Sequence, residues 1–67
     1  MDSITAQAKT ATLRELRKLL FDTDLYTVIG GKDEMTNKES RDYLYDLDDQ
    51  DYVYNYAIED GCLYIWG

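Results

Sequence analysis

Residues 52–66, YVYNYAIEDGCLYIW, contain two runs of aromatic and β-branched side chains that predict a β-hairpin. The runs are joined by Asp60-Gly61, a pair that accepts the positive φ angles of a two-residue hairpin turn. A turn at these two positions places Glu59 opposite Cys62 and sets the pairing of every other residue in both strands. This hairpin is the part of the chain from which the rest of the fold is predicted.

The side chains of the two strands alternate between the faces of the hairpin. The more apolar face is expected to pack against helices, and it consists of Tyr54, Tyr56, Ile58, Leu63 and Ile65. The opposite face combines Tyr64 and Trp66 with polar residues. We interpret this second face as an aromatic outer surface of the sheet; the alternative is a partner surface, since Tyr and Trp are enriched in binding hot spots.

A first helix is expected over residues 4–21, where apolar side chains recur at helical spacing. Its start has two alternatives. Ser3 can cap a long helix, whereas Thr12 and Glu15 have the spacing of a capping box that would start a shorter one. The long helix is preferred because residues 6–11 include three alanines, which are good helix formers.

A second helix is predicted from Asn37 to about Leu47, since Thr36 and Glu39 form a capping-box pattern. Between the two helices, residues 25–29 (LYTVI) have strand composition and are followed by a Gly-Gly turn. The expected order is therefore α-β-α-β-β over residues 1–67. This predicts a single-domain α+β protein in which two helices pack on a small antiparallel sheet.

The net charge of −7 lies entirely in residues 42–67, which contain no Lys or Arg, whereas residues 1–41 are neutral. A block of charges of one sign indicates which partners a protein can bind and says little about its fold. It argues against binding to DNA, RNA or an anionic membrane and favours a basic partner surface. In the neutral part, the basic residues Arg14, Arg17 and Lys18 are expected to form a solvated helix face, with a secondary contact site as the alternative.

If the second helix reaches Asp49, helical spacing places four acids on one face: Glu39, Asp42, Asp46 and Asp49. Acids near the C-terminal end of a helix oppose its dipole, and such a conflict often marks a functional site. A plain solubility face is an equal alternative. The candidate partner-binding residues are Glu39, Asp42, Tyr45, Asp46, Asp48, Asp49, Asp51, Tyr52, Glu59 and Asp60.

No catalytic motif, cofactor site or metal site is predicted. The chain has no His and a single Cys, so the usual zinc ligands are missing. The acids of residues 46–51 lack the central Gly and final Glu of a calcium loop. A chain of 67 residues also has little room for the cleft that a catalytic carboxylate pair needs. We therefore expect a protein that is not an enzyme.

The N-terminal sequence lacks the pattern of a signal peptide, and no apolar run approaches the length of a membrane span. Together with the single cysteine, this predicts a cytoplasmic protein. It is expected to be a monomer or a weak homodimer.

In size, acidity and tyrosine content, the chain resembles the small, phage-encoded anti-CRISPR proteins that mimic DNA. The resemblance rests on the acids of residues 42–60 and the tyrosines among them. It implies inhibition of a type I CRISPR effector complex, with subtype I-C as the first candidate, by occupation of the basic surface that reads target DNA. It also implies that the host is a bacterial cell.

Carboxylates spaced at about 5–6 Å along a helix can imitate a row of phosphates that are about 7 Å apart. Two other classes of function remain as alternatives. One is an antitoxin or immunity protein that neutralises a basic partner without mimicry. The other is a small homodimeric scaffold in which the face that carries Trp66 is buried.

Overall fold

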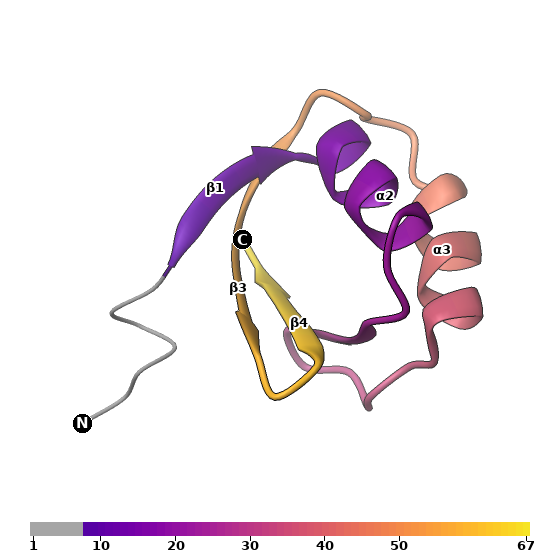
Figure 1. Cartoon of the computed structure of the whole chain (residues 1–67). Helices are drawn as coiled ribbons and strands as arrows, with labels where there is room; N and C mark the ends of the chain where they lie inside the picture. Colours follow the sequence, from indigo (N-terminus) through magenta and orange to yellow (C-terminus); the bar gives the residue numbers. More distant parts are fainter. Residues whose placement is uncertain (1–7) are drawn as a thin grey trace.

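The elements follow one another in the order β-α-β-α-β-β. The computed structural model describes residues 8–67 and contains β1 (Lys9–Thr12), α2 (Leu13–Phe21), β2 (Tyr26–Ile29), α3 (Asn37–Tyr45), β3 (Val53–Glu59) and β4 (Cys62–Trp66). Both helices lie against the same face of one four-stranded sheet (Figure 1). The predicted α+β class with two helices is thereby confirmed, with one additional strand at the start.

The β3–β4 hairpin has the predicted turn and register. Asp60 and Gly61 adopt φ angles of 54° and 75°, the left-handed conformation that the two-residue turn requires. Glu59 pairs with Cys62, and the pairing continues to Asn55 and Trp66 without a bulge. Local turn chemistry is therefore enough to fix the two central strands of the sheet.

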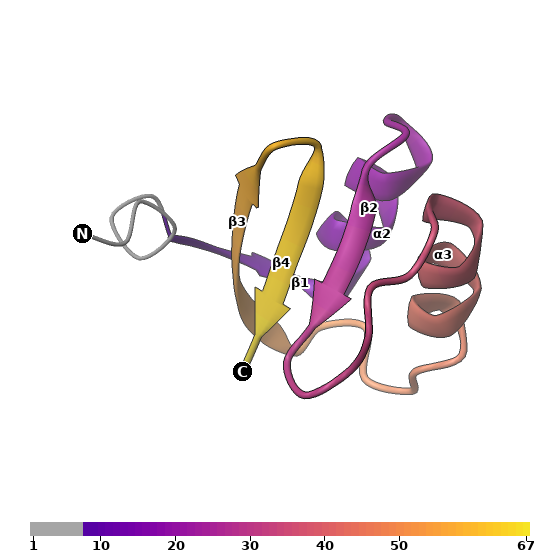
Figure 2. The ribbon, with the colours of Figure 1, turned by 90° about the horizontal axis from the view of Figure 1, so that it is seen from below.

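The sheet is mixed, so the prediction of an antiparallel sheet is wrong for one pair of strands. The strand order is β1-β3-β4-β2, in which β1 pairs with β3 antiparallel and β2 pairs with β4 parallel. β1 and β2 run in the same direction because α2 connects them as a crossover helix. The hairpin occupies the space between these two edge strands (Figure 2).

The first helix is shorter than the preferred prediction. Residues Lys9–Thr12 are a strand, and the helix starts at Leu13 after the Thr12–Glu15 capping box. Within this box the Thr12 amide donates to Glu15 Oε1 over 2.8 Å, and the Glu15 amide donates to Thr12 Oγ1 over 3.2 Å. Pairing with β3 overrides the helix propensity of Ala11. Residues 4–7 and the Ser3 cap of the long-helix alternative lie outside the described residues.

The core is a cluster of leucines between the helices and the hairpin. It contains Leu13, Leu16, Leu20, Leu44, Leu63 and Ile65, all at most 2% exposed. The assignment of the apolar hairpin face to the core is confirmed for Leu63 and Ile65, and Tyr54 and Tyr56 pack against the cluster. Ile58 is the exception, with 41% of its surface exposed.

Asn37, the first residue of α3, fixes the position of α3 relative to α2. Its side-chain Nδ2 lies 3.0–3.1 Å from the carbonyl oxygens of Leu20, Thr23 and Leu25. These carbonyls belong to the end of α2 and to the connection that leads into β2, where the regular hydrogen bonds of the helix end, and the Leu20 carbonyl also accepts the Thr23 amide over 3.4 Å. The two helices are thereby held side by side on the sheet.

Thr27 on β2 is fully buried, and its hydroxyl has no hydrogen-bond partner among the described residues. We expect Thr27→Val to stabilise the protein by about 1 kcal/mol, because it replaces an unsatisfied hydroxyl with a methyl group of similar shape. A change of that size corresponds to a rise in Tm of about 4–8 °C for a domain of this length. Thermal unfolding followed by circular dichroism measures it, and an unchanged or lower Tm would mean that the hydroxyl is satisfied.

Candidate acidic partner-binding surface

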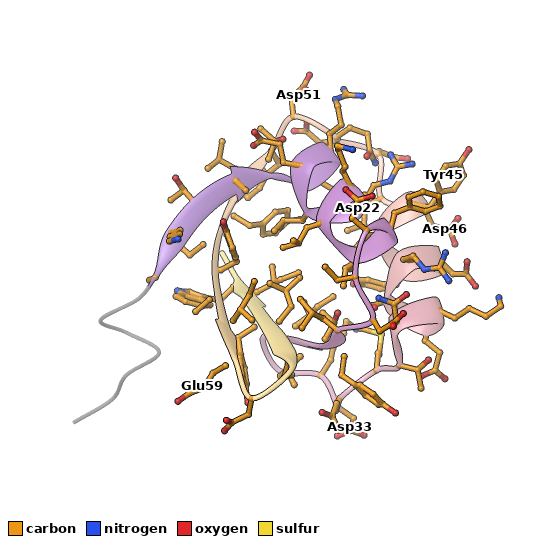
Figure 3. The ribbon with its side chains drawn as sticks, viewed as in Figure 1. Asp22, Asp33, Tyr45, Asp46, Asp51 and Glu59 are labelled. Carbon is orange, nitrogen blue, oxygen red and sulfur yellow. The ribbon has the colours of Figure 1, made fainter. Side chains whose placement is uncertain are left out.

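The densest group of acids lies in the connection between α3 and β3. Residues 46–51, here called the acid loop, carry four exposed carboxylates on Asp46, Asp48, Asp49 and Asp51. The loop projects from the end of the molecule where α3 ends and α2 begins, and Figure 3 shows Asp46 and Asp51 on it. It is the part of the predicted site that the structure does bring together.

The acid loop is anchored to the N-terminal end of α2 through the main chain. The amides of Leu13 and Arg14 have no helical acceptor, and they donate to the carbonyl oxygens of Tyr52 and Gln50 over 2.9 and 3.0 Å. Acids near a helix N-terminus also interact favourably with the helix dipole. The start of α2 therefore offsets part of the repulsion among the carboxylates of the loop.

Side chains of α2 add a second set of anchors. Arg14 Nη2 forms an ion pair with Asp51 Oδ1 over 3.1 Å, and the Arg17 guanidinium donates to the Gln50 side-chain oxygen. Within the loop, Asp49 Oδ1 accepts a hydrogen bond from the Asp51 amide. These contacts tie the loop to α2 but leave the side chains of Asp46 and Asp48 without any hydrogen bond or ion pair within residues 8–67.

Tyr45 and Tyr52, two of the candidate partner-binding residues, lie at the two ends of the acid loop. Tyr45 is 68% exposed, and the Arg17 guanidinium lies over its ring at 4.5 Å from the centroid. The Tyr52 ring packs against Tyr54 with 4.7 Å between the ring centroids, and it is also exposed. Both phenol rings are available to a partner that contacts the loop.

The predicted helical row of acids is not formed, because α3 ends at Tyr45 and Asp46 is its C-cap. Asp42 is exposed one turn before the loop, where it forms an ion pair with Lys38 over 3.1 Å. Glu39 lies in the first turn of α3, and its carboxylate accepts the Thr36 amide in the capping box. Glu39 thus has a structural role and does not join the acid loop.

Glu59 and Asp60 lie at the other end of β3, beside the hairpin turn (Figure 3). The seven residues of β3 separate them from the acid loop by about 20 Å. The strand thus divides the candidate acids of residues 39–60 into two groups.

Glu34 was missed by the sequence prediction. It lies near Cys62 in β4, because the chain after β2 turns back and Met35 forms a bridge with Thr27. No local pattern in the sequence signals this return, which joins residues far apart along the chain. Glu34 is thereby brought to the strand that follows the hairpin turn.

Cys62 is a buried free thiol. Burial raises the pKa of the Cys62 thiol above its ordinary value, and the charge of Glu34 raises it further. Because the thiolate is the reactive form, we expect iodoacetamide at pH 8 to alkylate Cys62 much more slowly in the native protein than in guanidinium chloride. Equal rates, followed by mass spectrometry, would contradict the burial of this strand.

The same pKa shift has a consequence for stability. A raised pKa means that the folded state holds the thiol proton more tightly than the unfolded state, whose value is near 9.0. The contribution of Cys62 to stability is therefore present below pH 9 and is lost as the pH rises through the folded value.

No three Asp, Glu or Cys side chains among residues 8–67 gather in a way that could hold a metal ion. Neither of the described helices has the length and apolar character needed to cross a membrane.

Comparisons with protein-family models, with curated proteins and with solved structures gave no significant match to the chain. The function is therefore inferred from the residues and their geometry, together with the resemblance in composition.

Proposed function

We propose that the acid loop binds a basic, nucleic-acid-binding surface of another protein in place of DNA phosphates and thereby blocks DNA binding. The observation that carries this proposal is the set of four exposed carboxylates on one short loop whose backbone is anchored to α2. The protein acts by binding alone, as an inhibitor without enzymatic activity.

The anchored loop suits this role because little conformational freedom is lost when it binds. Alternate residues of a loop have Cα atoms at most about 7 Å apart, which matches the scale of phosphate spacing along a strand. Arg and Lys side chains that otherwise hold phosphates accept carboxylates with similar geometry. Tyr45 and Tyr52 supply aromatic contacts beside the charges, which are typical of binding hot spots.

The separation of the two groups of acids is also compatible with mimicry. Glu59 and Asp60 lie about 20 Å from the acid loop along β3, which equals the rise of about six base pairs. A channel that holds duplex DNA is long enough to contact both groups. The turn acids would then provide a second, weaker contact.

The target that we propose is the DNA-reading surface of a type I CRISPR effector complex, with subtype I-C as the first candidate. The support is the resemblance in size, acidity and tyrosine content to anti-CRISPR proteins that mimic DNA. The site of action would be the cytoplasm of a bacterial cell. Binding is expected to be fast and to weaken as the salt concentration rises.

The test is a binding experiment with the purified effector complex, with and without DNA. A fluorophore is attached at position 9 through the substitution Lys9→Cys, and Cys62→Ser removes the native thiol from the same variant. The labelled protein is added either to the free complex or to the complex that has already bound duplex DNA containing the target sequence. We expect the fluorescence anisotropy to rise with the free complex and to stay at the value of the free protein with the DNA-bound complex. An equal rise with both would contradict mimicry, and co-purification with a toxin would favour the antitoxin alternative.

A further inference from the structure

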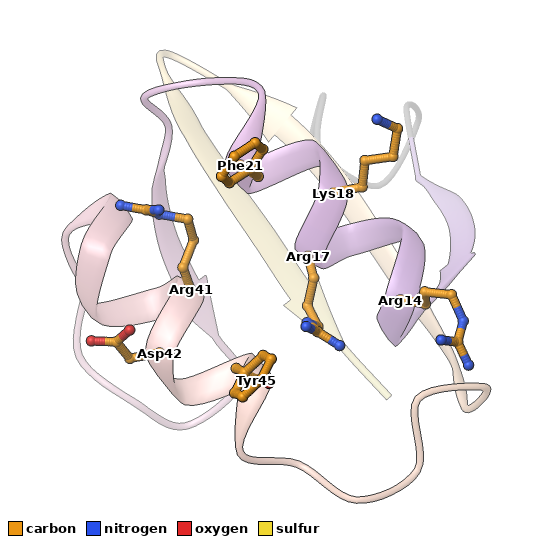
Figure 4. A pocket seen from close by; sticks show the side chains of 7 residues that line it. All are labelled: Arg14, Arg17, Lys18, Phe21, Arg41, Asp42 and Tyr45. Carbon is orange, nitrogen blue, oxygen red and sulfur yellow. The ribbon is translucent and has the colours of Figure 1, made fainter.

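The groove between α2 and α3 has the opposite charge to the rest of the molecule. It has a volume of about 530 Å³ and is lined by Arg14, Arg17, Lys18 and Phe21 of α2 and by Arg41 and Tyr45 of α3 (Figure 4). Among residues 8–67, Asp42 is the only acid in its lining, and Lys38 already forms an ion pair with it. A protein with a net charge of −7 therefore has four cations around one groove.

Three of these cations have partners at the surface of the molecule. Arg14 pairs with Asp51, Lys18 pairs with Asp22, and Arg17 contacts Gln50 and Tyr45. The two ion pairs are exposed, so each contributes little to stability.

Arg41 is different, because its guanidinium has no partner within residues 8–67. It forms no ion pair, and its Nε is buried without a hydrogen-bond acceptor. A buried donor that lacks an acceptor is destabilising and is uncommon in folded proteins. Because Arg41 lines the groove, a ligand carboxylate there would pair with this guanidinium through a charge-assisted hydrogen bond.

The groove also offers apolar surface. Phe21, at the C-terminal end of α2, is 74% exposed, and the exposed ring of Tyr45 lies on the opposite helix. Phe21 is unusual because the other apolar residues of α2 mostly face the core. An exposed Phe beside unsatisfied positive charge indicates a ligand that combines an aromatic or aliphatic group with carboxylates.

We propose that this groove, here called the α2–α3 groove, binds an acidic peptide segment of a partner protein. The segment would place a carboxylate on Arg41 and an apolar side chain against Phe21. From Arg14 to Phe21, α2 rises by about 10 Å, the length of about three extended residues. Recognition of acidic motifs by clusters of arginine is an established mode of peptide binding.

A nucleic acid fits the α2–α3 groove less well than a peptide does. A strand that continued beyond the groove would meet Asp22, Asp42 and Asp51 at its rim, and the net charge of the protein would repel it. The first amides of α2, which could bind a phosphate, are already occupied by the carbonyls of Gln50 and Tyr52. A short segment with isolated carboxylates avoids both difficulties.

The test uses the full chain and a fluorescein-labelled hexapeptide, Gly-Glu-Asp-Phe-Glu-Gly, followed by fluorescence anisotropy at about 0.15 M salt, where the screening length is about 8 Å. We expect saturable binding that Arg41→Gln weakens by about tenfold or more, the effect of losing one charge-assisted hydrogen bond. Phe21→Ser, which changes an exposed side chain and leaves the core intact, is expected to weaken binding as well.

Lys32→Gln is the matched control, because it removes the same charge from an exposed position outside the groove. It is expected to leave the peptide affinity unchanged within about twofold, since long-range charge effects are screened. The proposal is overturned if the hexapeptide shows no saturable binding or if Lys32→Gln weakens it as much as Arg41→Gln. Tighter binding of a labelled oligothymidylate, or of a second copy of the chain detected by light scattering, would also overturn it.

Discussion

Replacing Asp46 and Asp48 with lysine is expected to weaken binding to the basic partner surface by about a hundredfold or more. Close charge pairs across an interface are coupled by about 1.5 kcal/mol or more, and each 1.4 kcal/mol changes the affinity about tenfold. Charge reversal adds repulsion to the loss of each attraction. The affinity for the effector complex, measured by fluorescence anisotropy, gives this change directly.

These two positions are chosen because their side chains have no structural role. Neither forms a hydrogen bond or an ion pair within the described residues, whereas Asp49 and Asp51 bond within the loop and to Arg14. A lysine at position 46 even agrees with the dipole of α3, since it lies at the C-cap. The variant should therefore retain the Tm of the unmodified protein.

The matched control is the pair Asp24→Lys and Asp33→Lys, which changes the net charge by the same amount at exposed positions outside the acid loop. We expect this control to weaken binding much less than the acid-loop variant. Equal losses in the two double variants would show that net charge, and not the acid loop, determines the affinity.

Replacing Leu63 with alanine is expected to leave the protein largely unfolded at 25 °C. Leu63 is fully buried in the central strand β4 and belongs to the leucine core. Removing a buried leucine side chain is destabilising by about 2–5 kcal/mol, and a domain of this size has a total stability of only about 3–5 kcal/mol. Circular dichroism and Trp66 fluorescence would both show the loss of structure.

Ile58→Ala is the control for this experiment, because Ile58 pairs directly with Leu63 but is 41% exposed. Its loss is expected to lower the free energy of unfolding by about 1 kcal/mol or less. If urea titrations give equal destabilisation for both variants, Ile58 is as much a part of the core as Leu63 is, which would contradict its exposed position.

Sequence reasoning predicted the parts of the fold that depend on neighbouring residues. The hairpin turn at Asp60-Gly61 and the capping box of α3 need only residues within one turn of each other, and both were confirmed. β1 could not be predicted in the same way. Its alanine and threonines form a strand because β3 is available for pairing, and this partner lies far away in the sequence.

The sequence predicted which residues form the candidate site, but it predicted their arrangement in space only in part. The charge block identified the acids of residues 46–51, and these lie together on one exposed loop. Glu59 and Asp60 are separated from the acid loop by the length of β3, a strand that the hairpin prediction already included. The anchoring of the loop to Arg14 and Leu13 depends on tertiary packing, for which the sequence carries no local signal.

The arrangement of the basic residues of α2 could also be predicted only in part from the sequence. Their helical spacing predicted an exposed face, and Arg14 and Lys18 are indeed solvated. Arg41, however, comes from a different helix, and only the packing of α3 beside α2 adds it and Tyr45 to the same groove. A charge pattern along one helix cannot reveal a groove between two.

The central proposal, competition with DNA, is tested most directly by a gel shift that varies the order of addition. The purified type I effector complex is mixed with labelled target DNA, and the protein is added either before or after the DNA. We predict that DNA binding is lost when the protein is added first and is retained when the DNA is added first. Undiminished DNA binding in both orders, at a large excess of protein and with complexes of several subtypes, would contradict the proposed function.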